Sequence, residues 1–198
     1  MTQTLLFATN NQHKVEEIKK VVPNTYQVIS LNEAGINIDI EEPYDTFEEN
    51  AHKKAHTIFA LTYENCFSED TGLEVDSLDG APGVKSARYA GIERDFQKNN
   101  EKLLLELAKK NNRNARFRTV ICLIMYNHVH YFEGICEGTI ALEPKGIHGF
   151  GYDPIFVPTG SNHTFAEMDI TEKNQFSHRK KAFAKMIAFL ESLPHGKN

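Results

Sequence analysis

Three segments of the sequence carry polar or charged side chains whose types and spacing could do chemistry. The first is Thr9-Asn10-Asn11-Gln12-His13-Lys14, which follows a short apolar run and precedes a helical pattern. A turn from a strand into a helix directs free backbone N–H groups at one point, where the helix dipole favours an anion. Lys14 would lie in the first helical turn, where a cation is disfavoured unless an anion is bound. The segment is either a phosphate-binding turn or an ordinary Asn-capped helix with a solvated lysine. Because it contains no glycine, it is not a Walker P-loop.

The second segment type is acidic. Glu41 and Glu42 precede a helix, and Glu69 and Asp70 follow an apolar run that predicts a strand ending in a turn at Thr71-Gly72. Magnesium prefers hard oxygen ligands and usually takes one or two carboxylates together with phosphate oxygens. Ligand sites of α/β proteins gather at the carboxyl ends of strands, which favours Asp70. A solvated acidic loop is the alternative interpretation, above all for the glutamate pair.

The third segment is Ser177-His178-Arg179-Lys180-Lys181, with Lys173 shortly before it. Four potential cations would lie in the first turn of the last helix, where the dipole disfavours positive charge. A bound polyanion would reverse that effect, and His178 and Arg179 are the favoured contacts. The alternative is a basic surface screened by solvent.

An aromatic turn completes the set of candidates. Gly149-Phe150-Gly151-Tyr152-Asp153-Pro154 places two aromatic rings between and beside glycines. Such a turn lets the backbone approach a flat base closely while a ring packs against it. A tight turn with core aromatics is the alternative.

The elements that must position these residues follow from periodicity and capping signals. The chain begins with a predicted buried strand at Thr4–Ala8. A helix follows at Asn11–Val22, with apolar positions every three to four residues, and then a second strand at Tyr26–Leu31. Thr46 and Glu49 have capping-box spacing and begin the next helix, Asn65–Ser68 reads as a strand, and Asp95 caps a helix that runs through Leu107. Two long strands, Ala115–Tyr126 and Val129–Leu142, are joined by a turn at Asn127-His128. The last predicted element is a helix over Ser177–Leu193. The pattern predicts a mixed α/β fold with a long central sheet flanked by helices, in a single domain over residues 1–198.

Composition limits the function classes. The 198 residues include 22 Lys and Arg and 27 Asp and Glu, so the formal net charge is −5. This balance disfavours nucleic-acid binding, which needs a basic face, and suits a small-molecule enzyme that recruits a divalent cation. The cysteines Cys66, Cys122 and Cys136 have no metal-site spacing, and we expect them to be reduced. With no basic leader and no apolar run of membrane-spanning length, we expect a cytoplasmic protein that makes no membrane contact.

Taken together, the motifs resemble those of the inosine triphosphate pyrophosphatase family. Six motifs occur in order across most of the chain: 8–14 (ATNNQHK), 47–51 (FEENA) with Lys54-Ala55, 69–73 (EDTGL), 80–83 (GAPG) with 86–89 (SARY), 149–154 (GFGYDP) and 177–179 (SHR). Each motif alone is weak, whereas six in order are specific. The sequence departs from the family pattern at Asn10 and His13, where the family usually has glycine, and at Thr71, where it often has serine.

The resemblance implies an elongated mixed sheet with helices on both sides, a nucleotide cleft between two lobes, and a homodimer. It implies Mg²⁺-dependent hydrolysis of ITP, dITP and XTP to the monophosphate and pyrophosphate. By position, Asp70 is the general base and a metal ligand, and Glu41 is the second metal ligand, with neighbouring Glu42 as the alternative. The implied substrate contacts are Thr9, Asn10, Asn11, Gln12, His13, Lys14, Thr71, Phe150, Gly151, Tyr152, Asp153, Lys173, His178 and Arg179.

Two rival functions remain open from the sequence. One is a pyrophosphatase for other nucleotides, such as a modified pyrimidine triphosphate. The other is a nucleotide-binding regulator without turnover, against which the joint presence of Asp70, Glu41 and Lys14 argues. A third idea, nucleic-acid binding through residues 177–181, is disfavoured by the net negative charge.

Overall fold

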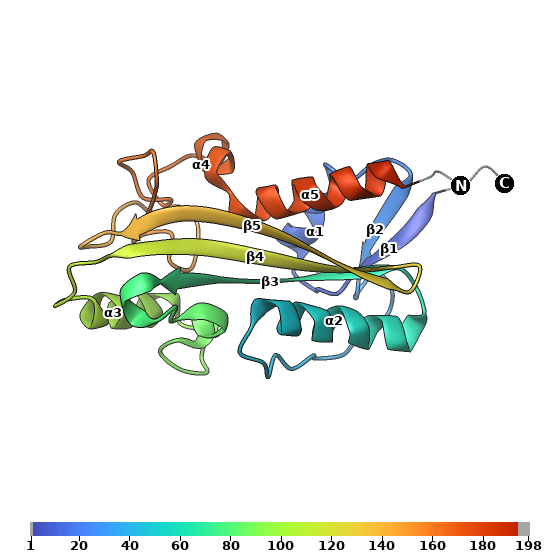
Figure 1. The fold of residues 1–198 in the computed structure, drawn as a ribbon, viewed down its shortest axis with the longest axis horizontal. Coiled ribbons are helices and arrows are strands. Elements are labelled where there is room, and N and C mark those ends of the chain that lie inside the picture. The colour runs from blue at the N-terminus through green and yellow to red at the C-terminus, as the bar shows by residue number, and fades with distance from the viewer. Residues whose placement is uncertain (1, 194–198) are drawn as a thin grey trace. The chain divides into compact units, whose positions relative to one another are not determined.

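The computed structural model describes residues 2–193. Within them, six strands form one sheet in the order β2-β1-β3-β4-β5-β6 (Figure 1). The strands are Gln3–Phe7 (β1), Tyr26–Ser30 (β2), Cys66–Val75 (β3), Asn114–Met125 (β4), His128–Ile140 (β5) and Phe156–Pro158 (β6). The α-helices are Gln12–Lys19 (α1), Phe47–Thr62 (α2), Phe96–Glu106 (α3), Ile170–Phe176 (α4) and His178–Ser192 (α5), and two 3₁₀ helices span Asp76–Leu78 and Gly83–Arg88. Parallel and antiparallel pairs occur in the same sheet, so the predicted mixed α/β class is confirmed.

The chain divides into two compact units. Unit 1 consists of residues 1–70, 120–133 and 181–198, and unit 2 consists of residues 71–119 and 134–180. Strands β3, β4 and β5 each contribute residues to both units. The assignment of residues 1–198 to a single domain stays a prediction.

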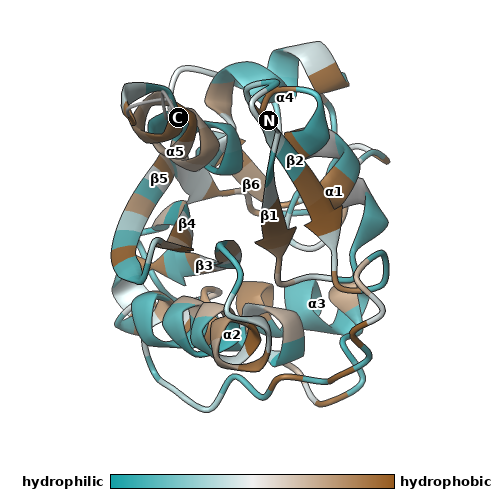
Figure 2. Ribbon diagram, turned by 90° about the vertical axis from the view of Figure 1, so that its right-hand side faces the viewer, coloured by the Kyte–Doolittle hydropathy of each residue, from teal (hydrophilic) through white to brown (hydrophobic). Residues whose placement is uncertain are grey.

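In unit 1, strand β1 runs parallel to both of its neighbours. Leu5 pairs with Val28 of β2, and Phe7 pairs with Phe67 of β3. The consecutive apolar residues of β1, brown in Figure 2, are typical of a strand that is covered on both faces. Helix α2 covers one face, where the Ser68 hydroxyl donates to the carbonyl of Ala51 at 2.5 Å.

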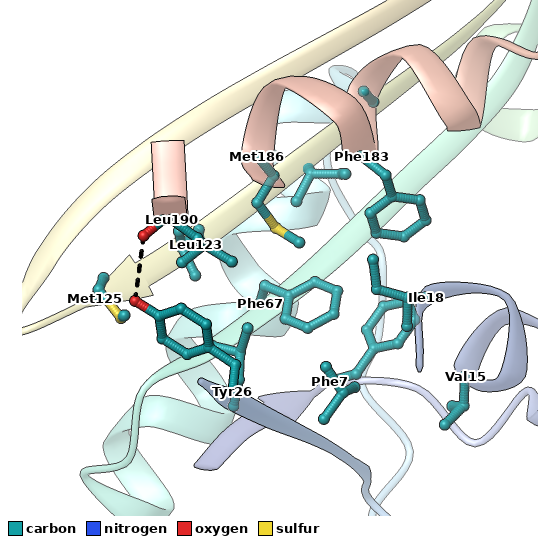
Figure 3. Close-up of a cluster of buried hydrophobic side chains, with 14 residues drawn as sticks. Phe7, Val15, Ile18, Tyr26, Phe67, Leu123, Met125, Phe183, Met186 and Leu190 are labelled. Atoms are coloured by element: carbon teal, nitrogen blue, oxygen red, sulfur yellow. Dashed lines mark hydrogen bonds between the residues drawn. The ribbon is translucent and has the colours of Figure 1, made fainter. Parts of the chain in front are cut away.

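The other face of the unit 1 sheet carries the aromatic core shown in Figure 3. The rings of Phe7 and Phe67 stack with centroids 4.2 Å apart, and Phe183 of α5 meets both rings edge-on. Val15 and Ile18 of α1 are fully buried in the same cluster. Helices α1 and α5 therefore pack on this face through the apolar positions that the periodicity predicted.

Unit 2 has its own core. Strand β6 pairs antiparallel with β5, where Gly138 lies opposite Pro158. Phe117 of β4 packs against the rings of Phe156 and Phe165, with centroids 4.7 and 5.9 Å away. These rings belong to a buried cluster that also includes Leu73, Val75, Leu103, Leu107, Ala115, Cys136, Ile140, Tyr152, Ile155 and Met168.

The predicted hairpin between the two long strands is confirmed, with its turn one residue earlier than expected. Tyr126 and Asn127 connect β4 to β5, and their φ angles are 50° and 65°. Positive φ at both central residues defines the type I′ turn that suits the twist of a two-residue hairpin. Tyr126 is held there because its N–H donates to the side chain of Asn65 at 2.8 Å.

The prediction that a strand ends at Ser68 and turns at Thr71-Gly72 is wrong, because β3 continues without a break to Val75. Turn-forming residue types at 70–72 are outweighed by the buried side chains of Leu73 and Val75, which alternate inward as a strand requires. Asp70 therefore lies in the middle of a strand.

The helix predictions were also incomplete at two places. Helix α1 ends at Lys19 rather than Val22, and the N–H groups of Val21 and Val22 donate to the Ile18 carbonyl in its final turn. Helix α4 was not predicted, although Asp169 caps it by accepting from the Glu172 N–H at 2.8 Å. Lys173 consequently lies in the last turn of α4, where the helix dipole favours a cation.

Candidate active site

The first predicted segment forms the connection from β1 to α1. Asn11 is the N-cap of α1, and its side-chain oxygen accepts from the Lys14 N–H at 3.3 Å. The Thr9 hydroxyl accepts from the Asn11 N–H at 3.2 Å, while Asn10 and Gln12 are exposed. The side chain of His13 lies outside the described residues. The turn is thus ordered by its own side chains, as the capped-helix interpretation expected.

Lys14 has a protein anion as its partner. Its ammonium Nζ lies 2.7 Å from Oε1 of Glu69, whose side chain is 1% exposed. A carboxylate near the first turn of α1 compensates for placing a cation there. The position of Lys14 therefore does not by itself require a bound phosphate.

A second lysine joins two carboxylates. Lys54 of α2 contacts Glu42 at 2.5 Å and Asp70 at 3.1 Å, and its side chain is 12% exposed. Helix α2 positions Lys54. The helix begins at its N-cap Thr46, whose hydroxyl accepts from the Glu49 N–H at 3.2 Å, and its residues Ala51 and Ala55 are fully buried against the sheet. Carboxylates from two distant parts of the chain thereby meet at one ammonium group.

The fold explains why Asp70, although it lies in mid-strand, is not flanked by strand β1. The neighbouring strand β1 ends at Phe7, which pairs with Phe67, so β3 runs on past the end of β1. Asp70 lies three residues beyond that last pair. Asp70 on β3 therefore lies just past the carboxyl end of β1, the region where ligand sites of α/β proteins form.

Burial raises the pKa of Asp70 to about 6, and Lys54 opposes this shift while Glu42 adds to it. Burial alone would lower the pKa of Lys54, but Asp70 and Glu42 outweigh it and raise that pKa. The raised pKa of Lys54 keeps this lysine protonated between the two acidic groups, whereas the raised pKa of Asp70 makes its carboxyl group easier to protonate.

The structure distinguishes the two adjacent glutamates. Glu42 contacts Lys54 and has a side chain that is 30% exposed. Glu41 is exposed, and within residues 2–193 its carboxylate forms no hydrogen bond or ion pair. Glu42 rather than Glu41 is therefore the glutamate that lies with Asp70, and the assignment of Glu41 as a metal ligand stays a prediction.

In unit 2, Asp153 organises the glycine-aromatic turn. Its Oδ2 accepts from the Phe150 N–H at 2.9 Å and from Lys173 Nζ at 2.5 Å, and its side chain is 6% exposed. Gly149 makes this possible, because its φ is 79° and an added Cβ would lie 2.1 Å from the same carboxylate oxygen. The opposite side of the turn is fixed by Asn100, which donates to the Gly151 carbonyl at 3.0 Å.

The two aromatic rings of this turn have different environments. Phe150 is 60% exposed as a residue, and the Lys173 ammonium lies 5.5 Å from the centroid of its ring. Tyr152 is buried, and its hydroxyl donates to the carbonyl of Ser86 at 2.9 Å. Phe150 therefore offers a ring face for stacking, whereas Tyr152 supports the turn from the core.

The remaining predicted residues of unit 2 are His178, Arg179 and Thr71. The His178 ring stacks on Phe117 with centroids 4.9 Å apart and an interplanar angle of 9°. Ser177 caps α5 through the Lys180 N–H at 3.2 Å, and Arg179 is half-buried. The hydroxyl of Thr71 forms a 2.8 Å hydrogen bond with that of buried Thr119.

Sequence reasoning did not identify Thr119 or Phe165, whose ring lies 5.2 Å from the Lys173 ammonium. No pattern in the sequence indicated that Lys54 pairs with Glu42. Among the described residues, no three His, Cys, Asp or Glu side chains form a ready-made metal site.

None of the helices within residues 2–193 has the length and hydropathy that a bilayer-spanning segment requires.

Comparison with known proteins adds relatives over nearly the full length. The model of the Ham1 family matches residues 5–189. A curated relative from Christiangramia forsetii, named dITP/XTP pyrophosphatase, is 50% identical over 186 residues, which cover 94% of this chain and 98% of the relative. The solved structure of the Staphylococcus aureus Ham1 protein has a TM-score of 0.91 at 38% identity and covers 96% of this chain and 98% of its own. The structure of a HAM1 protein from Coxiella burnetii has a TM-score of 0.92 at 35% identity, and the match covers 97% of this chain and 100% of that one.

Proposed function

The chain belongs to the Ham1 family, and from this premise we propose that it is a nucleoside triphosphate pyrophosphatase that hydrolyses non-standard purine nucleotides. Its substrates are dITP, XTP and ITP, and its products are the nucleoside monophosphate and pyrophosphate. The names of its relatives support the substrate class. The structural observation that carries the proposal is the cluster of Lys14, Lys54, Glu42, Glu69 and Asp70 in unit 1.

The charge of this cluster supports a requirement for a divalent cation. Two lysines and three carboxylates leave a net charge of −1, which repels a triphosphate. The carboxylates of Glu42 and Asp70 both reach Lys54, so their oxygens lie around a common point and form the hard donor set that Mg²⁺ prefers. Glu42 and Asp70 would hold the ion, which when bound offsets charge on the phosphates. Glu41 is the alternative to Glu42.

The residues of unit 1 have separate roles in the proposed reaction. Asp70 accepts a proton from the attacking water, and the new bond forms at the α-phosphorus as pyrophosphate leaves. Lys14 and Lys54 stabilise negative charge on the phosphate oxygens. Glu69, with its side chain 1% exposed, holds Lys14 in place. The turn residues Thr9 to His13 complete the phosphate contacts.

The residues of unit 2 are proposed to recognise the purine. The exposed ring of Phe150 stacks on the base, and Lys173 and Arg179 donate to the carbonyl at purine position 6. Asp153 orients Lys173, since the two side chains are 2.5 Å apart. Adenine carries an amino donor at position 6 and would leave a buried donor unpaired, which costs about 1–3 kcal/mol. Gly151, Tyr152, His178 and Thr71 are included as further substrate contacts.

The first test concerns the reaction itself. Wild-type protein with Mg²⁺ and dITP should yield dIMP and pyrophosphate, and release of orthophosphate alone would identify a phosphatase. Asp70→Asn should abolish turnover while the protein stays folded, as measured by circular dichroism. Near-normal kcat in this variant would rule out its role as general base. A wild-type protein that binds dITP but does not turn it over would be the regulator.

The second test separates the adjacent glutamates. Glu42→Gln and Glu41→Gln are matched, because each removes one negative charge from neighbouring positions. We expect Glu42→Gln to raise the Mg²⁺ concentration that gives half-maximal activity and Glu41→Gln to leave it nearly unchanged. The opposite order would assign the ligand to Glu41.

Three further parts of the proposal come from the sequence. The resemblance implies a homodimer, and the charge and hydropathy favour a cytoplasmic location without contact with nucleic acid or membrane. Light scattering on purified protein measures the first directly. A monomer at micromolar concentration would contradict it.

A further inference from the structure

The outward face of helix α2 carries a histidine pair that the proposed reaction does not use. His52 and His56 are one helical turn apart, and their ring centroids are 5.5 Å from each other. The buried face of α2 consists of other residues, namely Phe47, Asn50, Ala51, Ala55 and Ile58. Both histidines line an open pocket of about 390 Å³ within unit 1, together with Tyr44, Glu48, Glu49, Lys53 and Tyr131. Lys54, Glu42 and Asp70 are not among its lining residues.

The spacing of the two rings suits one transition-metal ion. A Zn–N bond is about 2.0–2.1 Å, and adding the radius of an imidazole ring places the metal roughly 3.2 Å from each centroid. A tetrahedral angle at the metal then separates the centroids by roughly 5.2 Å, and a right angle separates them by roughly 4.5 Å. The observed 5.5 Å is close to the tetrahedral value, so the backbone already brings the two imidazoles to chelating distance.

The surroundings favour a cation over an anion. Glu48 and Glu49 against Lys53 give the pocket a net charge of −1 when the imidazoles are neutral. Burial, followed by the proximity of His56, lowers the pKa of His52, which favours the neutral form that binds metals. Glu48 precedes His52 by one helical turn and lines the same pocket, so its carboxylate adds to the attraction for a cation.

We propose that His52 and His56 chelate one divalent ion of the borderline class, such as Ni²⁺, Cu²⁺ or Zn²⁺, at this pocket. Imidazole nitrogen suits these ions, whereas Mg²⁺ takes oxygen ligands, so the site is chemically distinct from the carboxylate cluster of unit 1. The described residues contain no ready-made group of three ligands, so water fills the remaining coordination positions through the open mouth of the pocket.

The test is calorimetric titration of the untagged full-length chain with Ni²⁺ in excess Mg²⁺, which keeps the carboxylate cluster supplied with its preferred ion. We expect one Ni²⁺ per wild-type chain and at least roughly tenfold weaker binding in both His52→Ala and His56→Ala, because losing either ligand removes the chelate. His128→Ala is the matched control, since His128 is an exposed histidine of unit 1 at the start of β5. It should bind Ni²⁺ like the wild type.

A thermal shift gives a second readout. Ni²⁺ should raise the melting temperature of the wild type and of His128→Ala but not that of the double variant at 52 and 56, since only a ligand bound to the native state stabilises it. Alanine is the best helix former, so both variants should retain α2. Absence of wild-type binding, a loss in only one of the two variants, or a loss in His128→Ala would each overturn the proposal.

Discussion

Replacing Gly149 by alanine should break the support of the glycine-aromatic turn. The φ of 79° costs a residue with a side chain about 1–2 kcal/mol. The new Cβ would lie 2.1 Å from Oδ2 of Asp153, so the carboxylate must give up its contacts with the Phe150 N–H and Lys173. Losing a hydrogen bond to a charged group costs about 1.5–3 kcal/mol. Counting the φ cost and the hydrogen bond from the Phe150 N–H alone, the expected loss of unfolding free energy is at least about 2.5–5 kcal/mol.

Gly151→Ala is the matched control for this prediction. Gly151 has a φ of 65°, but an added Cβ would meet nothing within 4 Å, so only the conformational cost of about 1–2 kcal/mol applies. Urea denaturation of both variants measures the difference. Under the proposed function, Gly149→Ala should also raise KM for dITP more than it lowers kcat, because Lys173 loses its orienting partner. Equal losses of stability in the two variants would refute the reasoning.

Three further predictions concern unit 1. Phe67→Ala should lower the unfolding free energy by about 3–5 kcal/mol in urea denaturation, because its ring is fully buried in the aromatic core; a loss below about 1.5 kcal/mol would contradict this packing. Two hydrogen bonds lower the pKa of Glu33 to about 2, the larger contribution coming from Lys19 and the smaller from the Ser30 N–H. Glu33 therefore stabilises the fold fully above pH 4.5, and this stabilisation is lost as the pH falls toward 2. Glu33→Gln should therefore lower the melting temperature slightly at pH 7 and much less at pH 2, and an equal effect at both would argue against the pairing. Burial raises the pKa of the thiols of Cys66 and Cys122 to about 12, so iodoacetamide at pH 8 should label them only after denaturation, which mass spectrometry detects.

The sequence predicted well those features that depend on neighbouring residues. The N-caps at Thr46 and Asp95 are confirmed, because a cap is a contact between residues three positions apart. The hairpin was expected from two long runs rich in β-branched and aromatic residues, and it is present. The apolar face of α5 was expected from its periodicity and is buried.

Features that depend on distant contacts were missed for a common reason. The length of β3 is set by the buried side chains of Leu73 and Val75, which the local turn signal at residues 70–72 concealed. Helix α4 has seven residues and none of them is buried, so it leaves no apolar stripe to recognise. The contact between Glu42 and Lys54 joins residues twelve positions apart, so no local pattern in the sequence distinguished Glu42 from Glu41.

Each lysine assigned to the substrate has a carboxylate partner within its own unit. Lys14 contacts Glu69, Lys54 contacts Asp70 and Lys173 contacts Asp153, at 2.7, 3.1 and 2.5 Å. A cation near a helix N-terminus suggested an absent anion, but for Lys14 the anion is part of the chain. Under the proposed function, a bound triphosphate must therefore share these lysines with the carboxylates, and its affinity is the difference between two sets of ion pairs. Removing Glu69 by Glu69→Gln would release Lys14 from its partner. It should tighten ground-state binding of pyrophosphate if this competition limits affinity, and weaken it if Glu69 mainly holds Lys14 in position.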